Sequence, residues 1–159
     1  MTTALRFSLI PLLTLALCSC AKGQTSFTDV PPVREELRED IFRYMFQRYN
    51  YGAYVKIYCI QADRLLFDNF TRRFDDVKIP VVWASECTMA GPWNSIHHRK
   101  SGAAGMRMAI RSVTWISATE AEARVEALSD GIAANENTLQ LKLKGKRWVV
   151  VHDKVDSVS

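Results

Sequence analysis

His97 and His98 are adjacent in the sequence, and such a pair could contribute a metal ligand or a general base. A zinc site needs three or four converging ligands, and no nearby cysteine or histidine completes one. We therefore expect no metal, and solvated histidines are the simpler interpretation. With Arg99, Lys100 and Trp93 the pair forms a candidate recognition loop, since aromatic and arginine side chains dominate interface energetics.

Motifs of known catalytic centres are missing from the chain. It has no Gly-x-Ser-x-Gly elbow, no P-loop and no Gly-x-Gly-x-x-Gly fingerprint. We therefore expect no catalytic residues and no cofactor. Tyr44, Tyr54 and Tyr58 could donate a hydrogen bond to a ligand, but tyrosines on helices and strands are usually packing residues.

The first 19 residues have the layout of a secretory signal. Arg6 is their only charge, an apolar stretch runs from Phe7 to Leu17, and small residues follow at once. The stretch is too short for a permanent membrane helix, which takes about 20 apolar residues. Residues 1–19 are therefore predicted to direct export and to be removed.

Cys20 is the predicted lipidation site. Leu17-Cys18-Ser19-Cys20 resembles a bacterial lipoprotein signal, with leucine at the third position before the acylated cysteine and a small residue just before it. Cys18 fits less well because the bulky Leu17 precedes it. The alternative is ordinary cleavage after Ala21. A lipid anchor would hold the protein on a membrane, facing the periplasm or the cell exterior.

Cys59 and Cys87 are the two cysteines that remain beyond Cys20. An exported chain meets an oxidising compartment, so a lone pair is interpreted first as a disulfide. A reactive thiol and a metal site stay open as alternatives, although no Cys-x-x-Cys is present.

The charge of the chain is mild. Removal of residues 1–19 takes away one of 21 basic residues and none of 17 acidic ones, which leaves a net charge of +3. Both signs are spread along the chain, whereas nucleic-acid binding favours a basic stripe interleaved with aromatics. The expected partners are the membrane, through the anchor, and a protein of the cell envelope, with no nucleic acid.

The chain has the length of one domain, at 159 residues with 48% hydrophobic composition. Residues 20–32 are predicted to be the lipid attachment and a tether, and 33–159 a single domain. Apolar residues recur every four positions from Val33 to about Asn50, which predicts a helix. A second, shorter helix is expected from Asp63 to Phe74, with its apolar residues on one side.

Strands are expected around these helices. Ala53–Ile60 and Pro80–Cys87 are predicted strands, and 88–105 is predicted to be irregular. Four strand-like runs follow: Met106–Ser117, Glu120–Leu128, Thr138–Lys142 and Arg147–Lys154. Short turns between them predict an antiparallel meander. The fold class is therefore α+β, with an N-terminal helix and a short second helix packed on a curved, mostly antiparallel sheet.

This order of elements resembles the ketosteroid-isomerase-like cone, the fold of the nuclear transport factor type. Separately, "FRYMFQ", "YCI", "SEC", "WISATEAEARV" and "GKRWVVVHDK" resemble stretches of small, uncharacterised bacterial lipoproteins. The second resemblance implies that Cys59 and Cys87 are paired, and it implies no activity. Ketosteroid isomerases place carboxylates inside the cone. The expected inward residues carry none: Ala121, Ala123, Val125, Ala127, Leu139 and Leu141.

Three functions are consistent with these patterns. The first is an exported, lipid-anchored, non-catalytic binding or interaction module of the cell envelope. The second is a cone-fold pocket protein that binds or transforms a small apolar ligand, and a cavity with convergent polar groups inside the cone would favour it. The third is an inhibitor or immunity protein against an envelope enzyme. A filled interior would favour the first.

Overall fold

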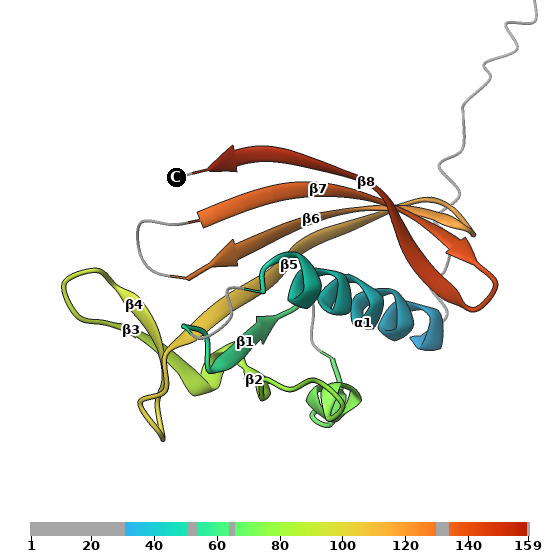
Figure 1. Ribbon diagram of the computed structural model, residues 1–159. Coiled ribbons are helices and arrows are strands. Elements are labelled where there is room, and N and C mark those ends of the chain that lie inside the picture. Colours follow the sequence, from blue (N-terminus) through green and yellow to red (C-terminus); the bar gives the residue numbers. More distant parts are fainter. Residues whose placement is uncertain (1–30, 51–53, 64–65, 130–133, 159) are drawn as a thin grey trace, which may run out of the picture.

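The computed structural model describes residues 31–50, 54–63, 66–129 and 134–158. The predicted signal segment, Cys20 and the tether up to residue 30 lie outside these ranges. The described part holds one α-helix, two short 3-10 helices and eight strands (Figure 1). Their order is α1 (Pro31–Arg48), β1 (Ile57–Gln61), η1 (Phe70–Phe74), β2 (Val81–Trp83), η2 (Ala84–Glu86), β3 (Cys87–Ala90), β4 (Ser95–His98), β5 (Gly105–Ser117), β6 (Glu120–Leu128), β7 (Ala134–Lys144) and β8 (Arg147–Val158).

Six strands form one mixed sheet in the order β2-β1-β5-β6-β7-β8. The meander from β5 to β8 is antiparallel throughout, as the sequence predicts. At the other end of the sheet, β1 runs parallel to both β2 and β5. The remaining strands, β3 and β4, form a separate antiparallel hairpin.

The long strands curl around α1, which lies across the inner face of the sheet (Figure 1). Leu37, Ile41 and Met45 are fully buried on the sheet-facing side of the helix, at the predicted four-residue spacing. The predicted inward residues of β6 and β7 lie in the same core, and all are buried: Ala121, Ala123, Val125, Ala127, Leu139 and Leu141.

The predicted second helix, Asp63–Phe74, is wrong over most of its length. Among the described residues of this segment, which exclude 64 and 65, only the five-residue turn η1 is helical, although Phe70 and Phe74 are buried as expected. Asp68 and Asn69 precede η1, and such side chains compete for backbone hydrogen bonds and favour turns over helix interiors. The two rings pack edge-to-face, with centroids 5.5 Å apart, so the short turn still fills the core.

The predicted strand Pro80–Cys87 and the predicted irregular segment 88–105 also need correction. β2 ends at Trp83, and η2 then turns the chain out of the main sheet. The carboxylate of Glu86 accepts a hydrogen bond from the Trp83 backbone N–H at 3.1 Å and stabilises this turn. Cys87 begins the hairpin β3–β4 instead of ending a strand.

The edge strand β8 carries two bulges. Val151 lies between the partners of Leu141 and Gln140, and Asp156 lies between the partners of Asn137 and Glu136, so each is an extra residue without an opposite on β7. A bulge shifts the alternation of side chains by one position. Asp153 is consequently opposite the inward-facing Leu139, on the core side of the sheet.

Candidate functional site

The hairpin β3–β4 projects from the body of the molecule (Figure 1). Its register pairs Cys87 with His98 and Ala90 with Ser95, and the four residues from Gly91 to Asn94 form the tip. Gly91 has φ of 78° and Asn94 has φ of 48°, a left-handed conformation that these two residue types tolerate best. The two positions of the tip that need a positive φ are therefore occupied by residues that adopt it readily.

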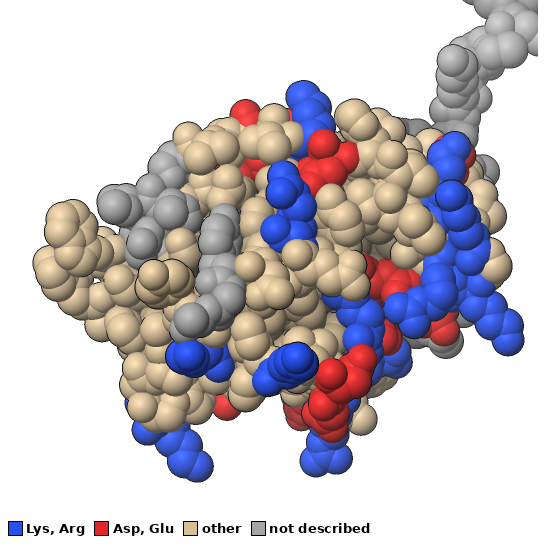
Figure 2. Space-filling view, in the orientation of Figure 1, with Lys and Arg blue, Asp and Glu red and all other residues tan. Residues whose placement is uncertain are grey.

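The hairpin is an uncharged projection on a charged protein. Residues 87–98 contain no Asp, Glu, Lys or Arg, and Figure 2 shows the projection free of charged residues. Trp93 at the tip is 63% exposed, and Met89 on β3 is also exposed. An exposed tryptophan on a narrow projection can enter an apolar pocket of another molecule with little loss of side-chain entropy.

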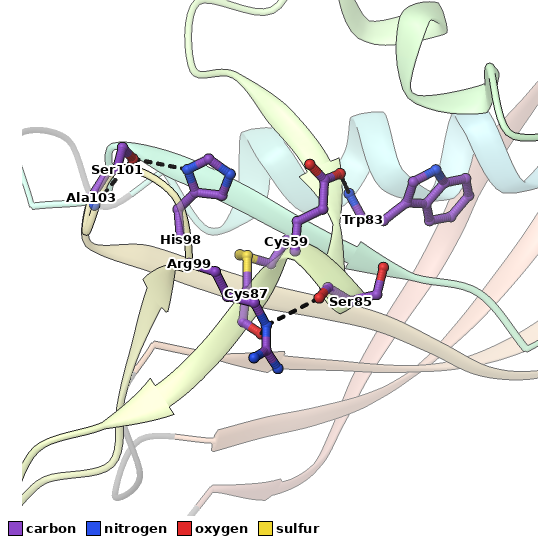
Figure 3. Close-up of a disulfide and its surroundings, with 9 residues drawn as sticks. Cys59, Trp83, Ser85, Cys87, His98, Arg99, Ser101 and Ala103 are labelled. Carbon is purple, nitrogen blue, oxygen red and sulfur yellow. Dashed lines mark hydrogen bonds between the residues drawn. A yellow bond between two sulfur atoms is a disulfide. The ribbon is translucent and has the colours of Figure 1, made fainter.

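A disulfide between Cys59 and Cys87 fastens the base of this hairpin to β1 (Figure 3), which confirms the predicted pairing. The Cα atoms of the two cysteines are 6.4 Å apart. Because Cys87 is the first residue of β3, the covalent link lies where the hairpin leaves the main sheet. The bond therefore limits how far the whole projection can tilt.

A second, small core supports the disulfide on the outer face of the sheet. Its buried members are Ile57, Cys59, Cys87, Ile96 and Leu128. A Cβ at Gly105 would lie 2.9 Å from Ile57 Cγ2, 3.2 Å from Cys59 Sγ and 3.3 Å from Ile96 Cγ2. Glycine is therefore required at this position by close packing.

The predicted recognition loop is divided between the two ends of the hairpin. Trp93 lies at the tip, whereas His97 and His98 end β4 and Arg99 and Lys100 follow at the base. Arg99 Nε donates hydrogen bonds to the backbone oxygens of Ser85, at 3.2 Å, and Cys87, at 3.0 Å (Figure 3). The arginine thus holds the base of the hairpin in place, and Trp93 is exposed at the tip.

The two histidines make local contacts within the turn that leads to β5. His97 Nδ1 is 3.3 Å from the backbone oxygen of Gly102, and His98 Nδ1 is 2.8 Å from Ser101 Oγ (Figure 3 shows the second contact). Within the described residues, no group of three His, Cys, Asp or Glu side chains is placed to hold a metal ion.

A polar network lies where α1 meets β7 and β8. Tyr44 donates a hydrogen bond to Asp153 at 2.6 Å, and Tyr49 donates one to the buried Asn137 at 2.7 Å. Asn137 in turn donates to Asp153, and Arg48 Nε lies 3.4 Å from the same carboxylate. Burial and then the bond to Asp153 raise the pKa of Tyr44 to about 12. Sequence reasoning missed the inward Asp153, because a bulge is invisible in simple alternation.

This network fixes the helix to the sheet. Both tyrosine hydroxyls donate to protein acceptors, and the apolar side chains of α1 fill the concave face of the sheet beside them. Its role in the described structure is to orient α1 across the meander.

The chain has no recognisable relatives in the comparisons with known proteins: no family model, curated protein or solved structure matches it. Across the described ranges, no helix has both the length and the apolarity needed to cross a membrane.

Proposed function

We propose that the protein is an exported, lipid-anchored interaction module of the cell envelope, without a catalytic role of its own, and that the β3–β4 hairpin contacts a protein partner. The observation that carries the proposal is the exposed Trp93 on an uncharged projection whose base is fastened by a disulfide. A structural disulfide suits an oxidising compartment and thus supports export.

The arrangement favours binding by insertion. A hairpin held by the Cys59–Cys87 bond and by Arg99 is already ordered before it meets a partner, so little conformational entropy is lost on association. The expected partner surface is an apolar pocket that accepts the Trp93 indole, with polar groups around it. Anchoring through Cys20 would keep the hairpin near the membrane, where an envelope partner is concentrated.

The filled concave face of the sheet favours this proposal over the cone-pocket alternative. Leu37, Ile41 and Met45 of α1 occupy the side of the sheet where a cone-fold enzyme would bind its ligand. The polar groups of the network at this face, Tyr44, Tyr49, Asn137 and Asp153, are hydrogen-bonded to one another.

Site-specific photo-crosslinking in intact cells tests the proposal. The full chain with a photoreactive phenylalanine analogue at position 93 should give discrete crosslinked adducts that mass spectrometry identifies as one protein species. The Trp93→Ala chain should capture that identified species about 30-fold less, or weaker still, than the wild-type chain does. A tryptophan anchor contributes about 2 kcal/mol or more to binding.

Phe67 supplies the matched control. It is an aromatic side chain outside the hairpin and is 67% exposed, so the photoreactive residue at position 67 should give no such adduct. The same adduct at equal yield from positions 67 and 93 would contradict the proposal, and so would unchanged capture by Trp93→Ala.

A further inference from the structure

An open cleft of about 510 Å³ lies between the C-terminal part of α1 and the loop before β2. The volume is in the range of small-molecule sites. Its described lining residues are Arg43, Phe46, Gln47, Asn50, Tyr58, Asp76, Val77, Lys78 and Ile79. Phe46, Val77 and Ile79 supply apolar walls, and a backbone hydrogen bond from Tyr58 N–H to the Pro80 oxygen, at 2.9 Å, holds the loop against β1.

Tyr58 is the unusual residue of this cleft. Its side chain stacks on Phe46 with ring centroids 4.7 Å apart and planes 12° apart, and the residue is only 2% exposed. None of the described residues hydrogen-bonds to its hydroxyl, and this oxygen is not fully buried, so it is open to a hydrogen-bond partner in the cleft. Burial raises the pKa of Tyr58, so the hydroxyl keeps its proton and remains a donor at neutral pH.

Of the charged residues that line the cleft, Lys78 is the cation that no described carboxylate neutralises. Arg43 donates to Glu39 at 2.9 Å and to Asp76 at 2.9 Å, so its guanidinium is neutralised and held in place. The hydrogen bond from Arg43 is the main cause that lowers the pKa of Asp76, which is therefore a carboxylate paired with that arginine. Lys78 is exposed at the rim and forms no ion pair within the described part of the chain.

We propose that this cleft binds a small anion with a flat apolar body, of the aromatic carboxylate class, and that the Tyr58 hydroxyl donates a hydrogen bond to it. The apolar body would lie against Phe46, Val77 and Ile79, and the negative charge would face Lys78. The cleft is separate from the hairpin, so this proposal does not depend on the proposed protein partner.

Calorimetric titration of the full chain with 2-naphthoate and with neutral 2-naphthalenemethanol tests the site. The wild type should bind naphthoate at one molecule per chain and the alcohol more weakly. Tyr58→Phe keeps the stacked ring and should weaken naphthoate binding about 2- to 10-fold, the worth of one hydrogen bond. Lys78→Gln should weaken naphthoate about 2- to 5-fold and leave the alcohol unchanged.

Each of the two variants has a matched control. Tyr54→Phe and Lys100→Gln alter exposed residues outside the cleft and should bind naphthoate as the wild type does. Tyr58→Phe should also keep the wild-type melting temperature, because the hydroxyl has no protein partner to lose. Three results would each overturn the proposal: no saturable binding of naphthoate, equal binding by Tyr58→Phe, or equal binding of the acid and the alcohol.

Discussion

Asp40 on α1 accepts a hydrogen bond from the backbone N–H of Trp148 on β8, at 2.7 Å and across 108 positions of sequence. The same carboxylate is 2.5 Å from Nη2 of Arg147. Asp40 is buried, so one helix residue fixes the start of the last strand and brings the β7–β8 turn against α1.

Asp40→Ala should lower the free energy of unfolding by about 1–3 kcal/mol, because it leaves the buried Trp148 N–H without an acceptor. Asp40→Asn retains an acceptor oxygen and should lose less. Urea denaturation measures both. The control Asp75→Ala removes an exposed carboxylate and should have almost no effect, and an equal loss in all three variants would contradict this role.

Stability at low pH should depend on Glu126. Burial raises its pKa, but hydrogen bonds from Arg111 and Arg107, the latter at 2.9 Å, outweigh that effect and hold the pKa below its ordinary value of 4.5. A pKa lowered by folding contributes stability that is complete above pH 4.5 and is lost as the pH falls through the folded-state pKa.

Glu126→Gln should therefore be less stable than the wild type at pH 7, and the difference should shrink as the pH falls below about 4.5. Melting temperatures measured from pH 7 to pH 3 check this. A difference that stays constant over the whole range would show that packing, and not the charge, is what the glutamate contributes.

Gly105→Ala should destabilise the base of the hairpin by about 1–3 kcal/mol, because the added methyl group overpacks the small core around Ile57. Ile57→Ala opens space at the closest contact, so the double variant should lose less than the sum of the two single losses. Denaturant unfolding of all three variants gives the coupling. Simple additivity would mean that the methyl group is accommodated elsewhere.

Loss of the Cys59–Cys87 bond should cost about 3–4 kcal/mol of stability, from the entropy of the loop that it closes. Replacement of both cysteines by alanine, followed by thermal unfolding, gives the value. Non-reducing mass spectrometry of the wild type should find the two residues linked, and two free thiols would refute the bond.

Cys20→Ala should abolish incorporation of radioactive palmitate, because the acylated thiol is removed. Cys18→Ala is the matched control, since Cys18 is predicted to leave with the signal segment, and it should keep the label. Continued labelling of Cys20→Ala would refute this lipidation site.

The parts of the fold that follow from local patterns were predictable. Charged and small apolar residues alternate from Glu120 to Ala127, and β6 (Glu120–Leu128) has the predicted bounds. The helix α1 begins at Pro31, two residues before the prediction, and keeps its apolar face. Its Glu39–Arg43 pair forms at 2.9 Å, as the four-residue spacing indicates.

Features that depend on distant partners were not predictable. The parallel pairing of β1 with β5 joins segments about 48 positions apart, and alternation within either segment says nothing of its neighbour. The strands β3 and β4 are too short to show a period, so the sequence predicts an irregular segment where they lie. Tyr58 has the pattern of a packing residue, and it lines a cleft only because the distant loop at Val77 packs near it.

The bulges at Val151 and Asp156 bear on how neighbouring copies would meet. Chains anchored in one membrane would be crowded in two dimensions, where long open sheet edges tend to merge. The β8 edge is interrupted at two places and carries the charged Lys154 between them, so it presents only short runs of regular backbone to a second copy. The β8 edge is thus a poor template for strand pairing with a second copy.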